Sequence, residues 1–156
     1  MKPKLKAIKS LHNAKPGQFV VLTRPVKAYK AAYDNMCGDN DGRLLVTLEI
    51  PKGAIVFTGE PGNDKLRANF ALVEKINVIK EEYDGPWDIK YSASKRTRKV
   101  AYSGIITRAT DESTQVTYRP GLLVAPRGKE FSFDATQYAP GIHFFLSRKA
   151  ALEHTG

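Results

Sequence analysis

The chain has 156 residues, 42% of them hydrophobic and 26% charged, which is typical of a folded soluble domain and not of a disordered segment. Its single cysteine, Cys37, excludes an intrachain disulfide framework and a multi-cysteine zinc site, and no apolar run is long enough to cross a bilayer. Lys and Arg number 25 against 16 Asp and Glu, so the net charge is +9, which favours a polyanionic partner such as nucleic acid or an acidic protein surface.

The amino-terminal segment, residues 1–16, is rich in lysine and contains no acidic residue. Its apolar residues fall at helical spacing, so it is predicted to be a basic arm or a short amphipathic helix that ends at Pro16-Gly17. Residues 17–156 are predicted to form a single globular domain. Because the first residues lack the apolar core of a secretory signal, the expected compartment is the cytoplasm.

Short apolar runs separated by Gly and Pro predict strands along most of the domain. The segment Val26–Tyr33 is compatible with a strand or a helix, and Asp34–Gly42 is a polar loop without the glutamate that an EF-hand requires. The fold class predicted is therefore a strand-rich α+β domain with one or two short helices. The strands are expected at Gln18–Thr23, Arg43–Ile50, Ala54–Thr58, Phe70–Ile79, Ala101–Thr110, Gln115–Arg119, Gly121–Ala125 and Ile142–Leu146.

The end of the chain is predicted to form a rigid corner. Pro140-Gly141 opens it as a turn, an apolar strand follows, and Ser147 is placed to cap a short helix. Because strand and helix meet at one serine, earlier segments of the chain are expected to pack on this corner.

Four segments carry a resemblance to a known family: IPKGAIVFTG, KLRANFALVEKI, VTYRPGLLVAP and APGIHFFLSRKAALE, in this order. They resemble an uncharacterised domain of phage and giant-virus proteins that ends in a GIHFF motif and is sometimes linked to pentapeptide repeats. The resemblance implies a viral accessory protein, in the host cytoplasm if it is phage-encoded, and it carries no established activity. The chain departs from the family pattern at Leu66 and at Tyr138 or Ala139, where relatives often have cysteine, and at Pro120, where they have valine.

The densest positive patch lies between Ile89 and Tyr102, where no acidic residue interrupts the cations. Lysine and arginine release counterions when they neutralise phosphates, and tyrosine rings stack on unpaired bases. No signature of a sequence-specific nucleic-acid reader accompanies the patch, and a solvated loop between strands is the structural alternative. The predicted polyanion-binding residues are Lys90, Tyr91, Lys95, Arg96, Arg98, Lys99 and Tyr102.

A second arrangement is similar to the core of ADP-ribosyltransferase-type folds. A Tyr-Arg strand, Tyr118-Arg119, precedes a strand with His143 and an alanine-containing helix with Glu153. The resemblance implies a nucleotide pocket lined by Tyr118, Arg119 and His143, although Glu153 lies on a helix and not at the start of a strand. A packed, hydrogen-bonded histidine is the structural alternative for His143.

No catalytic constellation, cofactor site or metal site is predicted, because the three histidines have no carboxylate partners or glycine-flanked serine at a recognisable spacing. The leading hypothesis is a non-enzymatic module that binds nucleic acid or an acidic host or viral protein. The alternatives are the nucleotide-binding pocket and an inhibitor of a host protein that contacts its target through the closing corner.

Overall fold

The computed structural model describes residues 4–34, 43–103, 116–126, 131–135 and 139–154. Within these ranges the protein is mostly β, so the predicted α+β class is wrong: the helical elements are one 3-10 turn, η1 (Leu11–Asn13), and one six-residue helix, α1 (Arg148–Glu153). The strands are β1 (Lys6–Ile8), β2 (Phe19–Leu22), β3 (Val26–Tyr33), β4 (Arg43–Ile50), β5 (Ile55–Phe57), β6 (Lys65–Ala68), β7 (Ala71–Tyr83), β8 (Ile89–Thr97), β9 (Ala101–Tyr102), β10 (Thr117–Tyr118), β11 (Leu123–Val124) and β12 (Ile142–Phe145).

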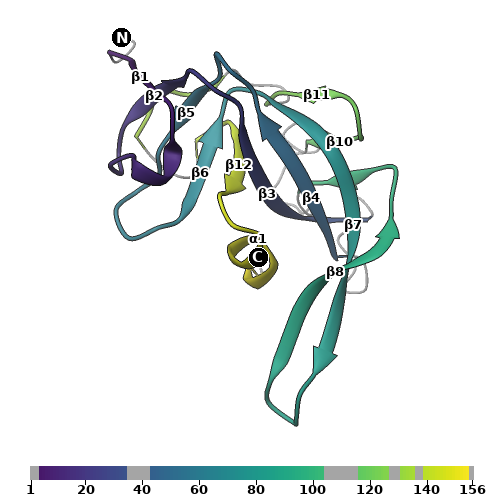
Figure 1. Ribbon diagram of the computed structural model, residues 1–156. Helices are drawn as coiled ribbons and strands as arrows, with labels where there is room; N and C mark the ends of the chain where they lie inside the picture. Colours follow the sequence, from purple (N-terminus) through teal and green to yellow (C-terminus); the bar gives the residue numbers. More distant parts are fainter. Residues whose placement is uncertain (1–3, 35–42, 104–115, 127–130, 136–138, 155–156) are drawn as a thin grey trace, which may run out of the picture.

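All these strands belong to one curled sheet in the order β1-β2-β5-β6-β12-β3-β4-β7-β11, with β8 on β7, β9 on β3 and β10 on β9 (Figure 1). The β1–β2 pair is parallel and the other described pairs are antiparallel. The last strand, β12, lies between β6 and β3 in the middle of the sheet. The closing corner of the chain is therefore a central element, as its apolar sequence requires.

Two segments that the sequence left open are strands. Val26–Tyr33 pairs with β4 over its whole length, and its small residues Ala28 and Ala32 are buried on the core side of the pair. The amino-terminal segment is not an amphipathic helix: β1 pairs with β2, and the backbone and hydroxyl of Thr23 both donate to the Ile8 carbonyl, at 2.9 and 3.1 Å. Pairing with β2 satisfies the backbone groups that a helix would have satisfied internally.

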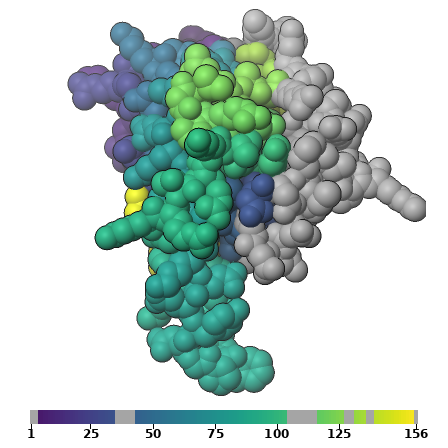
Figure 2. Space-filling model, turned by 90° about the vertical axis from the view of Figure 1, so that its right-hand side faces the viewer, coloured from purple at the N-terminus to yellow at the C-terminus, as the bar shows by residue number. Residues whose placement is uncertain are grey.

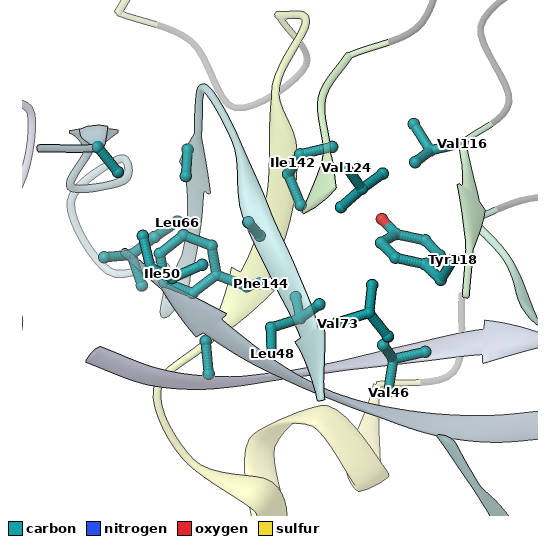
Figure 3. Packing of buried hydrophobic residues seen from close by; sticks show 14 of the residues in the cluster. Val46, Leu48, Ile50, Leu66, Val73, Val116, Tyr118, Val124, Ile142 and Phe144 are labelled. Carbon is teal, nitrogen blue, oxygen red and sulfur yellow. The ribbon is translucent and has the colours of Figure 1, made fainter. Parts of the chain in front are cut away.

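The main core fills the inside of the curled sheet (Figure 3). Leu44, Val46, Leu48 and Ile50 alternate along β4 into this core, as expected for one face of a strand. A second apolar cluster lies under α1 and contains Leu45, Ile79, Phe145, Ala151 and Leu152. No helix of the described residues is long and apolar enough to span a membrane.

The corner around α1 follows the sequence prediction. Ser147 has extended backbone dihedrals, and its hydroxyl accepts a hydrogen bond from the Ala150 amide at 3.0 Å, so the predicted cap is confirmed. The helix is short, and the burial of Ala151 and Leu152 against the sheet stabilises it.

The β7–β8 hairpin extends beyond the rest of the molecule as a long two-stranded arm (Figures 1 and 2). Its turn carries Trp87, whose surface is 91% exposed, between the exposed side chains of Tyr83 and Ile89. The predicted basic patch begins on β8, the outer strand of this hairpin, with Lys90, Tyr91, Lys95 and Arg96. Its other members follow the strand: Arg98 and Lys99 lie in the short connection to β9, and Tyr102 is on β9.

Candidate functional site

A bulge in β8 divides the predicted basic patch into two parts. Asn77 is opposite Thr97 and Ile79 is opposite Ala93, so β8 advances four residues while β7 advances two. The Asn77 side-chain amide donates to the Ser94 carbonyl at 3.0 Å and holds the bulge. A bulge bends its strand and changes the direction of its side chains. The cations after Ala93 therefore do not follow the regular alternation of side chains between the two faces of the hairpin.

On the tip side of the bulge, acidic residues neutralise the cations. The Lys90 amine lies 3.4 Å from the Asp84 carboxylate, and Lys80 lies 2.9 Å from Glu82. Residues 80–90 contain four acids and two lysines, which gives this end of the arm a net charge of −2. Lys90 is therefore a poor candidate for phosphate binding, although its sequence neighbourhood looked uniformly basic.

On the body side of the bulge, the cations have no acidic partner among the described residues. Lys95, Arg96 and Lys99 are exposed, and Arg98 is partly exposed with its guanidinium donating to the Thr97 carbonyl at 3.0 Å. The Arg98 amide donates to the Ile76 carbonyl at 3.0 Å, so this segment stays attached to β7. The end of β8 and the connection after it thus place four like charges within five residues, Lys95–Lys99.

The two predicted stacking residues are part of the packing. Tyr91 packs against the cluster under α1, and the Arg43 guanidinium lies 5.0 Å from the centre of its ring. Tyr102 on β9 is partly buried and is opposite both Tyr33 and Thr117 in the sheet. The exposed aromatic residues of the hairpin are instead Tyr83 and Trp87, at its tip.

The structure does not bring the predicted nucleotide-pocket residues together. Tyr118 is fully buried in the main core, and burial raises the pKa of its phenol. Arg119 is exposed in the turn that follows. His143 lies between Ile142 and Phe144 on β12, and since these two face the core, strand alternation turns His143 to the other side of the sheet. Glu153 is exposed on α1.

Arg67 on β6 is a buried cation that the sequence did not single out. Its side chain is 1% exposed, and its guanidinium donates to the carbonyls of Ser132, Asp134 and Pro140, at 2.7 Å for Ser132 and 3.2 Å for Pro140. Burial lowers its pKa to about 10, which leaves it charged at neutral pH. Arg67 therefore attaches the segment before β12 to the sheet.

Phenylalanine rings surround the same guanidinium. Its central carbon lies 4.8 Å from the ring centre of Phe57, 5.1 Å from that of Phe131 and 5.7 Å from that of Phe19. Phe133 packs on Phe19 and Phe131, with ring centres 5.3 and 5.5 Å apart. The sequence signal for this cage is the pair Phe131 and Phe133 within the otherwise polar stretch 127–134.

A second group of cations that the sequence missed lies beside the carboxyl end of α1. The Lys65 amine is 3.4 Å from Nε2 of His154, the Lys30 amine donates to the His143 carbonyl at 3.2 Å, and Arg43 donates to the His154 carbonyl at 2.6 Å. Burial, with repulsion from Lys65, lowers the pKa of Lys30 to about 7. Burial also lowers the pKa of Lys65 and, with the repulsion of the three cations, that of His154.

The described residues contain no group of three or more His, Cys, Asp or Glu side chains that could hold a metal ion. Comparison with curated proteins and with solved structures gave no match. One family model matches residues 10–151, which is most of the chain. The protein therefore belongs to that family, which is described as a family of unknown function (DUF5758).

Proposed function

We propose that the protein is a non-enzymatic module that binds nucleic acid through the body side of the β8 bulge. The observation that supports this most directly is the run of Lys95, Arg96, Arg98 and Lys99, which has no acidic partner among the described residues. Backbone phosphates are the ligands that such a run suits, because each cation that neutralises a phosphate releases a condensed counterion.

The binding mode expected is electrostatic and insensitive to sequence. The tyrosines next to the patch are engaged in packing, so they are not available to stack on bases. The exposed Trp87 lies on the acidic end of the arm, at least about 20 Å from Lys95 along a strand that rises about 3.3 Å per residue. The proposal therefore assigns binding to the charges of the bulge and not to the aromatic tip.

The setting we propose is that of a phage or giant-virus accessory protein, because the order of the four sequence segments resembles that of a viral domain. A viral protein that binds nucleic acid without catalysis acts by occupying or covering it. An acidic surface of a host protein would offer the same charges, and it is therefore an alternative ligand for the same residues.

The test is fluorescence anisotropy with labelled single-stranded and double-stranded oligonucleotides over a range of salt concentrations. The logarithm of the binding constant should fall linearly with the logarithm of salt, with a slope of about −0.9 for each phosphate contact on duplex DNA. Replacing Lys95, Arg96 and Lys99 together by alanine should weaken binding and reduce the steepness of that slope by about 2 to 3.

The matched control removes the same charge elsewhere. Lys15, Arg24 and Lys52 are exposed and lie outside β7 and β8, and their triple alanine variant also loses two lysines and one arginine. This control should keep most of the affinity and the slope. Equal losses of affinity in both triple variants would show that only net charge matters. Unchanged binding by the variant of Lys95, Arg96 and Lys99 would exclude the proposed site.

The sole tryptophan gives an independent reading. If nucleic acid binds at the bulge, anisotropy should change while the emission of Trp87 stays constant. A large quenching of Trp87 that parallels binding would place the nucleic acid at the tip and contradict the proposal.

A further inference from the structure

Four separate elements supply a compact cationic cluster beside the carboxyl end of α1. Lys30 comes from β3, Arg43 from β4, Lys65 from β6, and His154 follows α1. The Lys65 amine and the His154 ring are in hydrogen-bonding distance at 3.4 Å, and Arg43 reaches the His154 carbonyl at 2.6 Å. Lys30 is close enough to Lys65 and His154 for its charge to act on both.

Structural roles account for only part of this cluster. Arg43 donates to the carbonyls of Leu152 and His154, so it satisfies the backbone at the end of the helix. A lysine ammonium has three donors. Within the described residues Lys30 makes one hydrogen bond, to the His143 carbonyl, and Lys65 makes one, to the His154 ring. Both amines therefore keep donors for another acceptor.

The charge of the cluster is also not balanced by the described residues. Asp64 is the one carboxylate that acts on Lys65 and His154, against the three cations Lys30, Arg43 and Lys65. These groups are partly buried, so water screens their repulsion less than it would at an open surface. Among the described residues the cluster therefore carries an excess of positive charge that a bound anion would offset.

We propose that Lys30, Lys65 and His154 form a phosphate-binding site, with Arg43 adding charge behind them. Phosphate is favoured over a carboxylate because two lysines offer separate point charges, whereas planar bidentate recognition of a carboxylate is the usual role of a free arginine. Here the arginine is already engaged by backbone carbonyls. The ring of Phe145, whose centre lies 5.2 Å from that of His154 and 5.9 Å from the Lys65 amine, provides an apolar wall beside the site.

The test is isothermal titration of the full chain with inorganic phosphate and, in a second arm, with a nucleoside 5′-monophosphate, at constant ionic strength set with sodium chloride. Saturable one-site binding of inorganic phosphate is expected. Tighter binding of the nucleotide would identify a phosphate ester as the natural source, and equal binding would identify free phosphate. Absence of saturable binding in both arms would overturn the proposal.

Lys65→Gln tests the site directly, and it should weaken phosphate binding at least about tenfold, since it removes the amine that contacts His154. Lys27→Gln is the matched control, because Lys27 is an exposed lysine of β3 that pairs with Glu74 at 3.5 Å. The control should bind phosphate like the wild type. Equal affinity of the Lys65 variant and the wild type would contradict the assignment.

A second measurement guards against a folding defect in the Lys65 variant. In the wild type, the carbon-13 shift of the Lys30 Cε, followed by NMR as pH changes, should report a higher pKa when phosphate is present, because the anion favours the charged amine. An unchanged Lys30 titration in saturating phosphate would show that the anion binds elsewhere. The triple variant of Lys95, Arg96 and Lys99 should bind phosphate normally, which separates this site from the proposed nucleic-acid surface.

Discussion

Gly141 packs directly on the side chain of Arg67. A methyl group added at Gly141 would lie 3.1 Å from Cβ, 3.3 Å from Cγ and 3.2 Å from Cδ of the arginine. The two residues meet because β6 and β12 are adjacent, with His143 opposite Arg67. The glycine before the apolar strand is therefore explained by close approach of an arginine stem.

Replacing Arg67 by lysine should destabilise the protein strongly, although the charge is kept. A lysine amine cannot reproduce the planar fork that reaches the carbonyls of Ser132, Asp134 and Pro140, so these partly buried acceptors lose a charged donor. We expect the free energy of unfolding to fall by about 3 kcal/mol, measured by urea denaturation. A loss below about 1 kcal/mol would show that the three carbonyls find other donors.

Gly141→Ala should also destabilise the fold, by about 1 to 3 kcal/mol. Arg67 cannot move away from the new methyl group, because hydrogen bonds and phenylalanine rings hold its guanidinium. Chemical denaturation of the single variant and of the double variant with Arg67→Ala measures the coupling. If the contact is the cause, Gly141→Ala should cost much less in the Arg67→Ala background.

Removing the cap of α1 should have a moderate effect. The Ser147 hydroxyl accepts from the Ala150 amide at 3.0 Å, and Ser147→Ala loses this bond. Such caps contribute about 0.5 to 2 kcal/mol, and thermal unfolding followed by circular dichroism measures the change. Ser147→Asp restores an acceptor and should recover most of the stability, whereas equal losses in both variants would point to another role of the serine.

The lowered pKa of Lys30 predicts how the stability of the protein depends on pH. Its pKa is about 7 in the folded protein, against 10.5 for an ordinary lysine in an unfolded chain, so between these values the unfolded state binds more protons. The free energy of unfolding should therefore rise as pH increases from about 7 towards 10, and this dependence should be absent below the folded pKa. Lys30→Met should show a flatter profile over the same range in denaturation experiments. Parallel profiles would mean that Lys30 keeps an ordinary pKa.

Trp87 should contribute little to stability. It is 91% exposed at the end of the hairpin, and exposed substitutions away from special contacts usually change stability by less than about 0.5 kcal/mol. Trp87→Ala should therefore unfold at nearly the same urea concentration as the wild type. Efficient quenching of the wild-type emission by acrylamide is the accompanying expectation.

The sequence predicted those strands in which most residues are apolar and therefore buried. The segment Arg43–Ile50 is β4 with the same bounds, and the turn, strand and capped helix after Pro140 follow their sequence signals. The strand Lys6–Ile8 was not visible in the amino-terminal segment, because so short a strand gains its stability from pairing with β2, a partner elsewhere in the sequence. The helical content was overestimated for the same reason, since Val26–Tyr33 is fixed by pairing and not by its alanines.

The candidate sites depended on information that a linear sequence does not contain. The density of cations in Lys95–Lys99 was visible, but the bulge before it and the acids opposite Lys90 arise from the register of β7 and β8. At two positions where this chain differs from the family pattern, Leu66 and Ala139, the side chain is buried and contributes to packing. Tyr138 and Cys37 lie outside the described residues, as do most of Asp34–Gly42 and of Ala101–Thr110. Arg67 and Lys30 read as ordinary surface cations because their carbonyl partners are more than sixty residues away in sequence.

The position of β12 has a consequence for synthesis on the ribosome. The strand enters the sheet between β6 and β3, whose partners are made long before it. Until residues 142–145 leave the exit tunnel, β6 and β3 have unpaired edges that can join other chains. A nascent chain stalled before this point should therefore recruit chaperones or aggregate, and the emergence of residues 142–145 should allow β3 and β6 to pair in a single step.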